Sequence, residues 1–293
     1  MTAFALKLIA VVTMLIDHSG AVFGDIGLLP YGTTMVFRSI GRISFPIFAF
    51  LAANGWRYTR DRAKYLERML LDALVSAIPY SLAFADAWNP AGLFWNWNLW
   101  QTLLALTLLA CSLWGCLRSG LPKRGLVAGL TAAFLLLPGL SWRAGAAQIL
   151  WKEQSIFYTL GYALFLLSCW DLFRSRRLAG REIWRLPVLV LFPVLYTFDY
   201  GIFGVLLVLG LYLAAKRWQT ALVLAAFTVP LYMIPYYNVQ NLIFAGCFFL
   251  AALPVLRYNG EKGPGRQRWF YMIYPAHLLV LGILRICLLG GPE

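Results

Sequence analysis

The chain has 293 residues, of which 61% are hydrophobic and 13% charged, and its mean hydropathy is +0.71. This composition is typical of a polytopic membrane protein and excludes a soluble one. The formal net charge of +13 would suggest nucleic-acid binding in a soluble chain, but here the basic residues cluster in short loops between apolar runs. We therefore expect an all-α integral membrane helix bundle with no nucleic-acid partner.

The first apolar segment, residues 3–23, contains an Asp-His pair, Asp17 and His18. A charged aspartate inside a membrane span costs roughly 2.5–3.5 kcal/mol on insertion scales, and function is the usual reason for it. The segment lacks the small-residue cleavage site of a signal peptide, so we expect it to remain as a helix. The only other histidine, His277, lies in the last apolar segment. Two histidines in apolar spans suggest proton handling.

Eleven apolar segments are candidate spans, and together they form one predicted domain over 1–293. They lie near residues 3–23, 34–56, 66–85, 99–117, 124–140, 155–173, 186–198, 200–215, 218–235, 241–257 and 269–289. The segment 186–198 is short for a span of ~20 residues and contains Pro193. The sequence therefore predicts 10–11 transmembrane helices.

Basic residues alternate strictly between the loops. Of 25 Lys and Arg residues, 19 fall in every second loop, within residues 57–68, 118–124, 174–185, 216–217 and 257–268. The intervening loops hold only Arg143 and Lys152. By the positive-inside rule, the N-terminus is cytoplasmic and the C-terminus faces the outside.

This topology predicts a polar cluster in the outer half of the membrane. At 1.5 Å per residue His18 lies about 22 Å from the cytoplasmic end of its helix. Arg38 and Arg42, entering from the outside on the second span, should lie at a similar level and share one face at spacing i, i+4. Pro46 cannot donate a hydrogen bond to the carbonyl of Arg42. Asp17 and His18 point roughly 100° apart and cannot orient each other directly.

Each of these residues also has a structural reading. Asp17 and Arg42 would form a neutralising ion pair between helices, while His277, three residues after Tyr274, would be a hydrogen-bonded core histidine. Three further predictions are local. Asp72 pairs with Arg68 four residues before it, Asp199 is a cap, a turn or a functional residue, and the five cysteines are packing residues rather than a metal or redox site.

The chain resembles the TraX family in blocks that occur in family order: MLIDHSG, RSIGRISFPIFAFLAANG followed by YTRDRAKYLERML, DYGIFG, and RYNGEKGPGRQRWFYMIYPAHL. TraX acetylates the N-terminus of conjugative pilin, and the family is similar to transmembrane acyltransferases of the acyltransferase-3 type. The resemblance implies a bacterial inner-membrane enzyme that uses cytosolic acetyl-CoA and an acceptor on the far side. The positions that match are Asp17, His18, Gly41, Arg42, Asp199, Tyr258, Asn259, Gly260, Tyr274 and His277.

The residue chemistry agrees with such a reaction. An amine or hydroxyl attacks a thioester after losing a proton, and histidine is the side chain best matched to accept it at neutral pH. Arginine would stabilise the developing oxyanion, an effect worth about 3–4 kcal/mol when preorganised. The predicted catalytic residues are therefore His18, Asp17, Arg42, Arg38 and His277. No metal is expected.

Coenzyme A carries phosphates, and two basic loops lie on the side where it is made. The residues predicted to bind it are Arg60, Arg68, Asn259, Gly260, Arg266, Arg268 and Tyr274. Glycines near Asn259, including Gly263 and Gly265, would let backbone N–H groups approach a phosphate. The alternative for any single arginine is a purely topological role.

The sequence thus predicts a transmembrane acetyltransferase that moves acetyl from acetyl-CoA to an extracytoplasmic amine or hydroxyl, on a pilin N-terminus or a surface glycan. The pantetheine arm would enter a tunnel from the cytoplasm, pass His277 about 12 Å up its helix, and reach His18 beyond it. Two rivals stay open: a proton-coupled small-molecule transporter, which also uses membrane-embedded Asp, His and Arg, and a non-catalytic pilus or envelope assembly factor.

Overall fold

The structure is a computed structural model that describes residues 1–84, 155–174, 200–233, 238–264 and 269–289. The described residues are helical and contain no strand. They divide into two compact units, one of Met1–Tyr58 with Ile202–Leu281 and one of Thr59–Gly201 with Gly282–Glu293. The helical structure of the described residues confirms the predicted all-α class.

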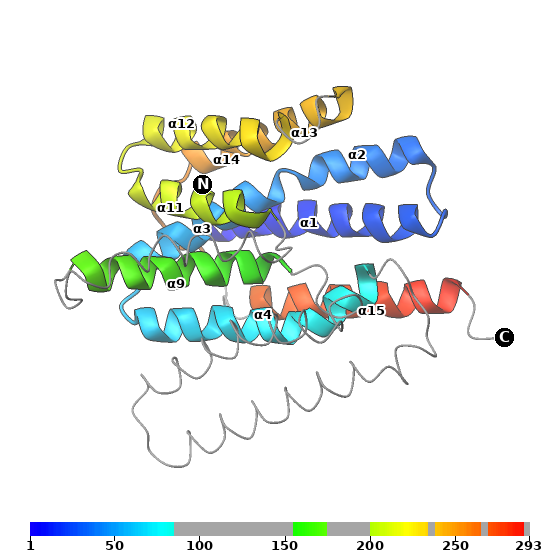
Figure 1. Cartoon of the computed structure of the whole chain (residues 1–293), viewed down its shortest axis with the longest axis horizontal. Helices are drawn as coiled ribbons and strands as arrows, with labels where there is room; N and C mark the ends of the chain where they lie inside the picture. Colours follow the sequence, from blue (N-terminus) through cyan, green and yellow to red (C-terminus); the bar gives the residue numbers. More distant parts are fainter. Residues whose placement is uncertain (85–154, 175–199, 234–237, 265–268, 290–293) are drawn as a thin grey trace, which may run out of the picture. The chain divides into compact units, whose positions relative to one another are not determined.

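In the first unit, α1 (Ala3–Asp25) packs against α2 (Tyr31–Gly41) and α3 (Ser44–Tyr58), as Figure 1 shows in blue. Thr2 caps the start of α1 by accepting a hydrogen bond from Ala5 N at 3.3 Å. The span predicted at 34–56 is not one continuous helix, because the backbone turns at residues 42–43 between α2 and α3. Pro46 in the first turn of α3 has no N–H for an intrahelical bond, which agrees with a break at this place.

The rest of the first unit comes from the C-terminal third of the chain. It comprises α11 (Gly201–Leu213), α12 (Arg217–Thr228), a π-helical turn η3 (Val229–Met233), α13 (Val239–Leu250), α14 (Ala252–Leu256) and most of α15 (Trp269–Leu288). Gln219 accepts hydrogen bonds from the backbone of residues 215 and 216, both at 2.9 Å, and so caps α12. In the described residues, α12 and η3 occupy the span predicted at 218–235, and α13 and α14 occupy the span predicted at 241–257.

The second unit pairs α4 (Arg62–Phe84) with α9 (Ile156–Arg174). Arg62 at the start of α4 forms a 2.7 Å ion pair with Asp171 near the end of α9, so the two helices run antiparallel. Arg285 donates a 2.8 Å hydrogen bond to the carbonyl of Ala83 and satisfies the end of α4. Asp72 Oδ2 is buried and makes no hydrogen bond. The predicted pairing of Asp72 with Arg68 is therefore not a hydrogen bond to this oxygen.

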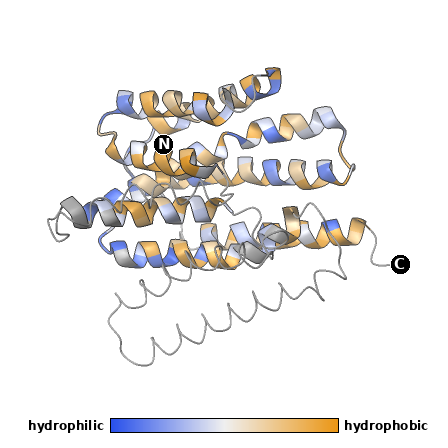
Figure 2. Ribbon diagram, in the orientation of Figure 1, coloured by the Kyte–Doolittle hydropathy of each residue, from blue (hydrophilic) through white to orange (hydrophobic). Residues whose placement is uncertain are grey.

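Four helical segments in the described part of the chain are long and apolar enough to cross a membrane: Ala3–Asp25, Tyr31–Tyr58, Val239–Leu256 and Trp269–Leu288. Hydrophobic residues cover most of each long helix in Figure 2. Many of them face outward, including Leu8, Leu253, Val280 and Ile283, as expected for contact with lipid tails. The chain is a helical membrane protein. Predicted spans 99–117, 124–140 and 186–198 lie outside the described residues, so the total of 10–11 stays a prediction.

The predicted sidedness of the loops agrees with contacts inside the first unit. The Met1 amine donates to Arg257 O at 2.5 Å, and Ala3 N donates to Glu261 O at 2.8 Å. Arg57, at the end of α3, donates to the carbonyl of Tyr212 in the last turn of α11 and to that of Ala214 just after it. The N-terminus, the end of the second span and two basic loops therefore meet at one end of the unit. That this end faces the cytoplasm remains a prediction.

Candidate functional site

The site is built where α1 and α2 approach closely. An added Cβ at Gly20 or Gly24 of α1 would collide with a side chain of α2, and one at Gly41 of α2 would collide with the Asp17 side chain. Gly20 and Gly24 have the small-xxx-small spacing that lets membrane helices come together without side chains between them. Because Gly41 has no side chain, the Asp17 side chain fits against the α2 backbone there and reaches the arginines of α2.

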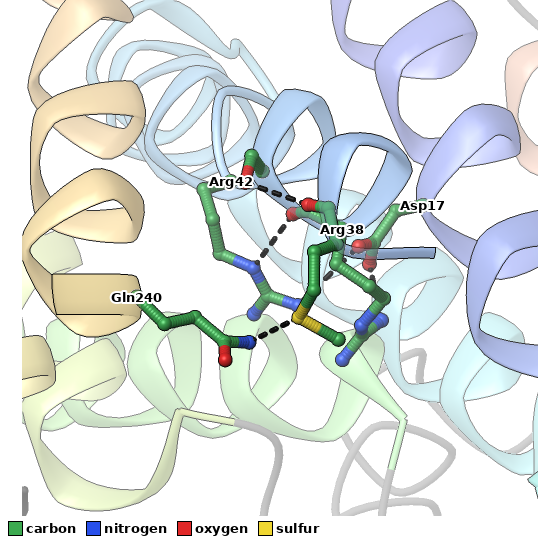
Figure 3. A network of polar contacts seen from close by, with 6 residues as sticks. Asp17, Arg38, Arg42 and Gln240 are labelled. Atoms are coloured by element: carbon green, nitrogen blue, oxygen red, sulfur yellow. Dashed lines mark hydrogen bonds and ion pairs between the residues drawn. The ribbon is translucent and has the colours of Figure 1, made fainter. Parts of the chain in front are cut away.

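Asp17 is paired with both predicted arginines. Its Oδ2 accepts from Arg38 Nη1 at 2.9 Å and its Oδ1 accepts from Arg42 Nη2 at 3.3 Å. Figure 3 shows the two guanidinium groups directed at one carboxylate. Arg42 also donates through Nε to the carbonyl of Arg38 at 3.1 Å. The predicted ion pair between α1 and α2 is therefore present, with Arg38 as a second partner.

α13 closes this cluster with residues that the sequence did not single out. Arg42 lies over the ring of Phe244, 5.0 Å from its centroid, which is a cation–π geometry. Gln240 accepts a 2.9 Å hydrogen bond from Tyr31 and contacts Met35, the latter contact being drawn in Figure 3. Gln240 precedes the predicted span 241–257 by one residue, which is a weak signal. Phe244 cannot be told from the other packing aromatics in the sequence.

His18 lies against His277 of α15. Nδ1 of His18 and Nε2 of His277 are 2.7 Å apart, and the two rings are nearly parallel, with centroids 5.0 Å apart and an interplanar angle of 11°. Both imidazoles are therefore at one level. The prediction that His277 lies nearer the cytoplasm than His18, at about 12 Å against about 22 Å from the helix ends, is wrong. His18 is the sixteenth residue of α1 and His277 the ninth of α15, so the two helices do not begin at the same level.

The hydrogen bonds of this pair set its tautomers. His277 Nδ1 lies 2.9 Å from the carbonyl of Ile273, which can only accept, so Nδ1 carries the proton. In the neutral ring Nε2 is then an acceptor, and His18 Nδ1 must donate to it. Nε2 is thus the unprotonated nitrogen of the His18 ring. This is the arrangement in which an imidazole acts as a base while a second group holds its orientation.

Tyr274 borders both imidazoles. Its ring meets His18 edge-on at 5.9 Å and His277 edge-on at 5.4 Å, and only 3% of the residue is exposed. Asp17 and His18 therefore face different partners, α2 and α15 respectively, as predicted from the 100° between successive helical residues. The Asp17 carboxylate bonds to the arginines of α2, whereas the hydrogen bond of His18 is made to His277.

The loop after α14 joins the N-terminus. Asn259 N donates to Met1 O at 2.9 Å, and the Asn259 amide side chain bridges to Glu261 N and to the Glu261 carboxylate. Tyr258 accepts from Asn54 at 3.3 Å. Gly260, at φ +86°, and Gly263, at φ +73°, permit the left-handed turns that this pairing needs. The N–H groups of Asn259 and Glu261 are thus engaged within the protein.

The remaining predicted residues are spread over the chain. Arg60 and Arg68 are exposed in the second unit. Asp199, Gly265, Arg266 and Arg268 lie outside the described residues. A search of the described residues finds no group of three or more His, Cys, Asp or Glu side chains that could hold a metal ion.

Comparison with known proteins agrees with the blocks noted in the sequence. The model of the TraX protein family matches residues 3–144 and 132–285, which together span nearly the whole chain. The chain belongs to the TraX family. A curated relative of this TraX chain is described as "Probable fimbrial assembly protein FimC, serogroup H1" from Dichelobacter nodosus. It is 26% identical over 292 aligned residues, covering 96% of this chain and 94% of the relative. No solved structure matches the chain.

Proposed function

We propose that this TraX chain is an acetyl-CoA-dependent acetyltransferase of the bacterial inner membrane, acting on an amine or hydroxyl at the extracytoplasmic side. The observation that carries the proposal is the hydrogen-bonded pair of the buried His18 and the half-buried His277 beside the Asp17–Arg38–Arg42 cluster. Ionisable side chains are energetically costly in apolar spans. The arginines alone would neutralise the charge of Asp17, so this neutralisation does not require a hydrogen-bonded histidine pair with defined tautomers.

The proposed reaction uses His18 as the general base. The acceptor nitrogen or oxygen attacks the carbonyl carbon of the acetyl thioester, and His18 Nε2 takes the acceptor's proton. The hydrogen bond from Nδ1 to His277 supports the charged His18 ring while the tetrahedral intermediate exists. The carbon–sulfur bond then breaks, and the coenzyme A thiolate leaves with the proton that His18 held. Acetylated acceptor and free thiol are the products.

Positive charge beside the base favours the same reaction. Arg42 is fixed by Asp17, by the Arg38 carbonyl and by Phe244, so its guanidinium is preorganised. A preorganised cation stabilises the negative charge that develops on the carbonyl oxygen, by about 3–4 kcal/mol in comparable sites. The proposed donor contacts at the membrane surface are Arg60, Arg68, Arg266, Arg268 and the Gly260 turn, with Tyr274 beside the path of the pantetheine arm.

A second candidate is a non-catalytic role in assembling a fimbria. It is favoured by the printed description of the relative from Dichelobacter nodosus, which names assembly and no reaction. The two candidates differ in one respect: an assembly factor needs the fold of the polar cluster but not the proton-accepting nitrogen of His18.

The experiment that separates them is mass spectrometry of surface proteins and glycans. Cells with the native protein, cells lacking it and cells carrying His18→Ala are compared, and fimbriae are counted in parallel. Acetyl groups that are present only with the native protein support the enzyme. Unchanged acetylation in all three strains, with fimbriae lost only where the protein is absent, supports the assembly role instead.

A further inference from the structure

The π-helical turn η3 (Val229–Met233) follows directly on α12 in the first unit. Pro230 within it has no backbone N–H, so it cannot donate the hydrogen bond that would continue the α-helix. A π turn closes i→i+5 hydrogen bonds and so takes in one extra residue, which rotates the chain by about 100° relative to an uninterrupted α-helix. The side chains of η3 therefore point in directions that α12 alone would not give them.

Tyr232 of η3 packs on two phenylalanines of α13. Its ring centroid lies 6.3 Å from that of Phe244, at an interplanar angle of 72°, and 5.5 Å from that of Phe248, at 60°. Phe244 and Phe248 are four residues apart and so share one face of α13. Tyr232 and Phe248 are both buried. Because aromatic pairs favour such edge-to-face arrangements, the Tyr232 ring restricts the rotation of the Phe244 ring.

Phe244 in turn contacts Arg42, whose guanidinium lies over the ring at 5.0 Å from its centroid. This attraction depends on the ring presenting its negative face, because the edge of an aromatic ring is positive. A Phe244 ring that turned would lose the contact. The place of Arg42 therefore depends on the orientation of Phe244, and that orientation depends on Tyr232.

We infer that Tyr232 is a positioning residue for acetyl transfer, which acts through Phe244 to hold Arg42 where the oxyanion develops. This inference rests on the proposed function. Asp17 and the Arg38 carbonyl hold Arg42 from α1 and α2, whereas the Tyr232–Phe244 pair holds it from η3 and α13. Such fixing from several elements is what preorganisation of a stabilising cation requires.

The first test compares Tyr232→Leu, which removes the ring, with Tyr232→Phe, which keeps it. Turnover is measured on the full-length protein in lipid nanodiscs, with labelled acetyl-CoA and with glucosamine and a short peptide with a free N-terminus as acceptor probes. We expect Tyr232→Leu to lower kcat by about threefold to tenfold, the size of a cation–π interaction, with little change in KM. Tyr232→Phe should retain the native kcat.

A double-mutant cycle tests whether the effect passes through Phe244. In a Phe244→Leu background, Tyr232→Leu should lower kcat no further, because the contact with Arg42 is already lost. The matched control is Phe249→Leu, which removes a ring from an exposed position of the same helix, α13, and should leave kcat unchanged. A native kcat in Tyr232→Leu, an equal loss in Tyr232→Phe, or additive losses in the cycle would overturn the inference.

The second test observes Arg42 itself and needs no acceptor. In the NMR spectrum of protein with isotope-labelled arginine, the Nε–H signal of Arg42 is the one that disappears in Arg42→Lys. Ring currents shift the signal of a group that lies over an aromatic face, so this signal should move in Tyr232→Leu and stay in Tyr232→Phe and Phe249→Leu. An unmoved signal in Tyr232→Leu would overturn the inference.

The two tests separate this inference from the proposed reaction. A signal that moves in Tyr232→Leu, with neither probe acetylated by the native protein, would contradict the proposed reaction alone. Acetylation by the native protein, with kcat and the Arg42 signal both unchanged in Tyr232→Leu, would contradict the positioning role alone.

Discussion

The chemistry of the site depends on which nitrogen of His18 carries a proton. The carbonyl of Ile273 fixes the His277 ring, and His277 in turn fixes His18, so that Nε2 is the nitrogen that accepts. The chain of hydrogen bonds begins at a backbone atom of α15 and ends at His18, the proposed base, on α1. Asp17, next to His18 in sequence, has the separate task of holding Arg38 and Arg42.

His18→Ala removes the proton acceptor and should lower acetyl transfer by about 10²–10⁴-fold, the usual contribution of general-base catalysis. Membrane insertion and thermal unfolding should change little, because the Asp17 ion pairs remain. Turnover is measured with purified protein and labelled acetyl-CoA. Near-normal turnover in a well-folded variant would place the base elsewhere.

His277 gives a finer test, because two substitutions separate its size from its hydrogen bond. His277→Phe fills the space but cannot accept from His18 Nδ1, and we expect kcat to fall by about tenfold or more with little change in KM. His277→Gln offers a side-chain oxygen as acceptor and should retain more of the rate. Equal rates in the two variants would show that the imidazole pair does not orient the base.

The sequence alone predicts part of this arrangement. Asp17, His18 and Arg42 stand out because ionisable residues are rare in apolar spans, and the i, i+4 spacing adds Arg38. The contact between His18 and His277 is not predictable in the same way. It depends on the level at which α15 begins relative to α1, which comes from tertiary packing and not from helix geometry within either segment.

At the scale of elements, the site requires close packing of α1 and α2. Gly20, Gly24 and Gly41 remove the side chains that would separate the helices, and the turn at residues 42–43 lets α2 and α3 take different directions. Pro46 hints at this break in the sequence. The end of α2 at Gly41 does not follow from Pro46 alone, because capping and packing decide where a helix stops.

Gly41→Ala should force the Asp17 carboxylate out of its place, because an added Cβ has no room there. We expect a loss of about 1–3 kcal/mol, typical of overpacking, together with a loss of activity. Thermal unfolding in detergent or nanodiscs measures the first effect. Gly32→Ala is the matched control, on the same helix with nothing near its added Cβ. Equal stability of the two variants would contradict the packing described for α1 and α2.

At the scale of the whole molecule, the predicted topology concerns the side of the membrane on which each loop lies. Reporter fusions at residues 60, 121, 180 and 262 should report the cytoplasm, and fusions near 91, 147 and 238 the outside, as the distribution of basic residues predicts. If two of the four reporters expected in the cytoplasm were found on the outside, the predicted topology would be contradicted. This test also covers the loops that lie outside the described residues.

The sidedness of the reaction in sealed vesicles is the most direct test of acetyl transfer across the membrane. Acetyl-CoA is supplied only on the cytoplasmic face, and an impermeant acceptor is held only on the other face. We expect acetylation of that acceptor by the native protein and none by His18→Ala. Acetylation that occurs only when donor and acceptor share one side, or that is equal in the two proteins, would contradict it.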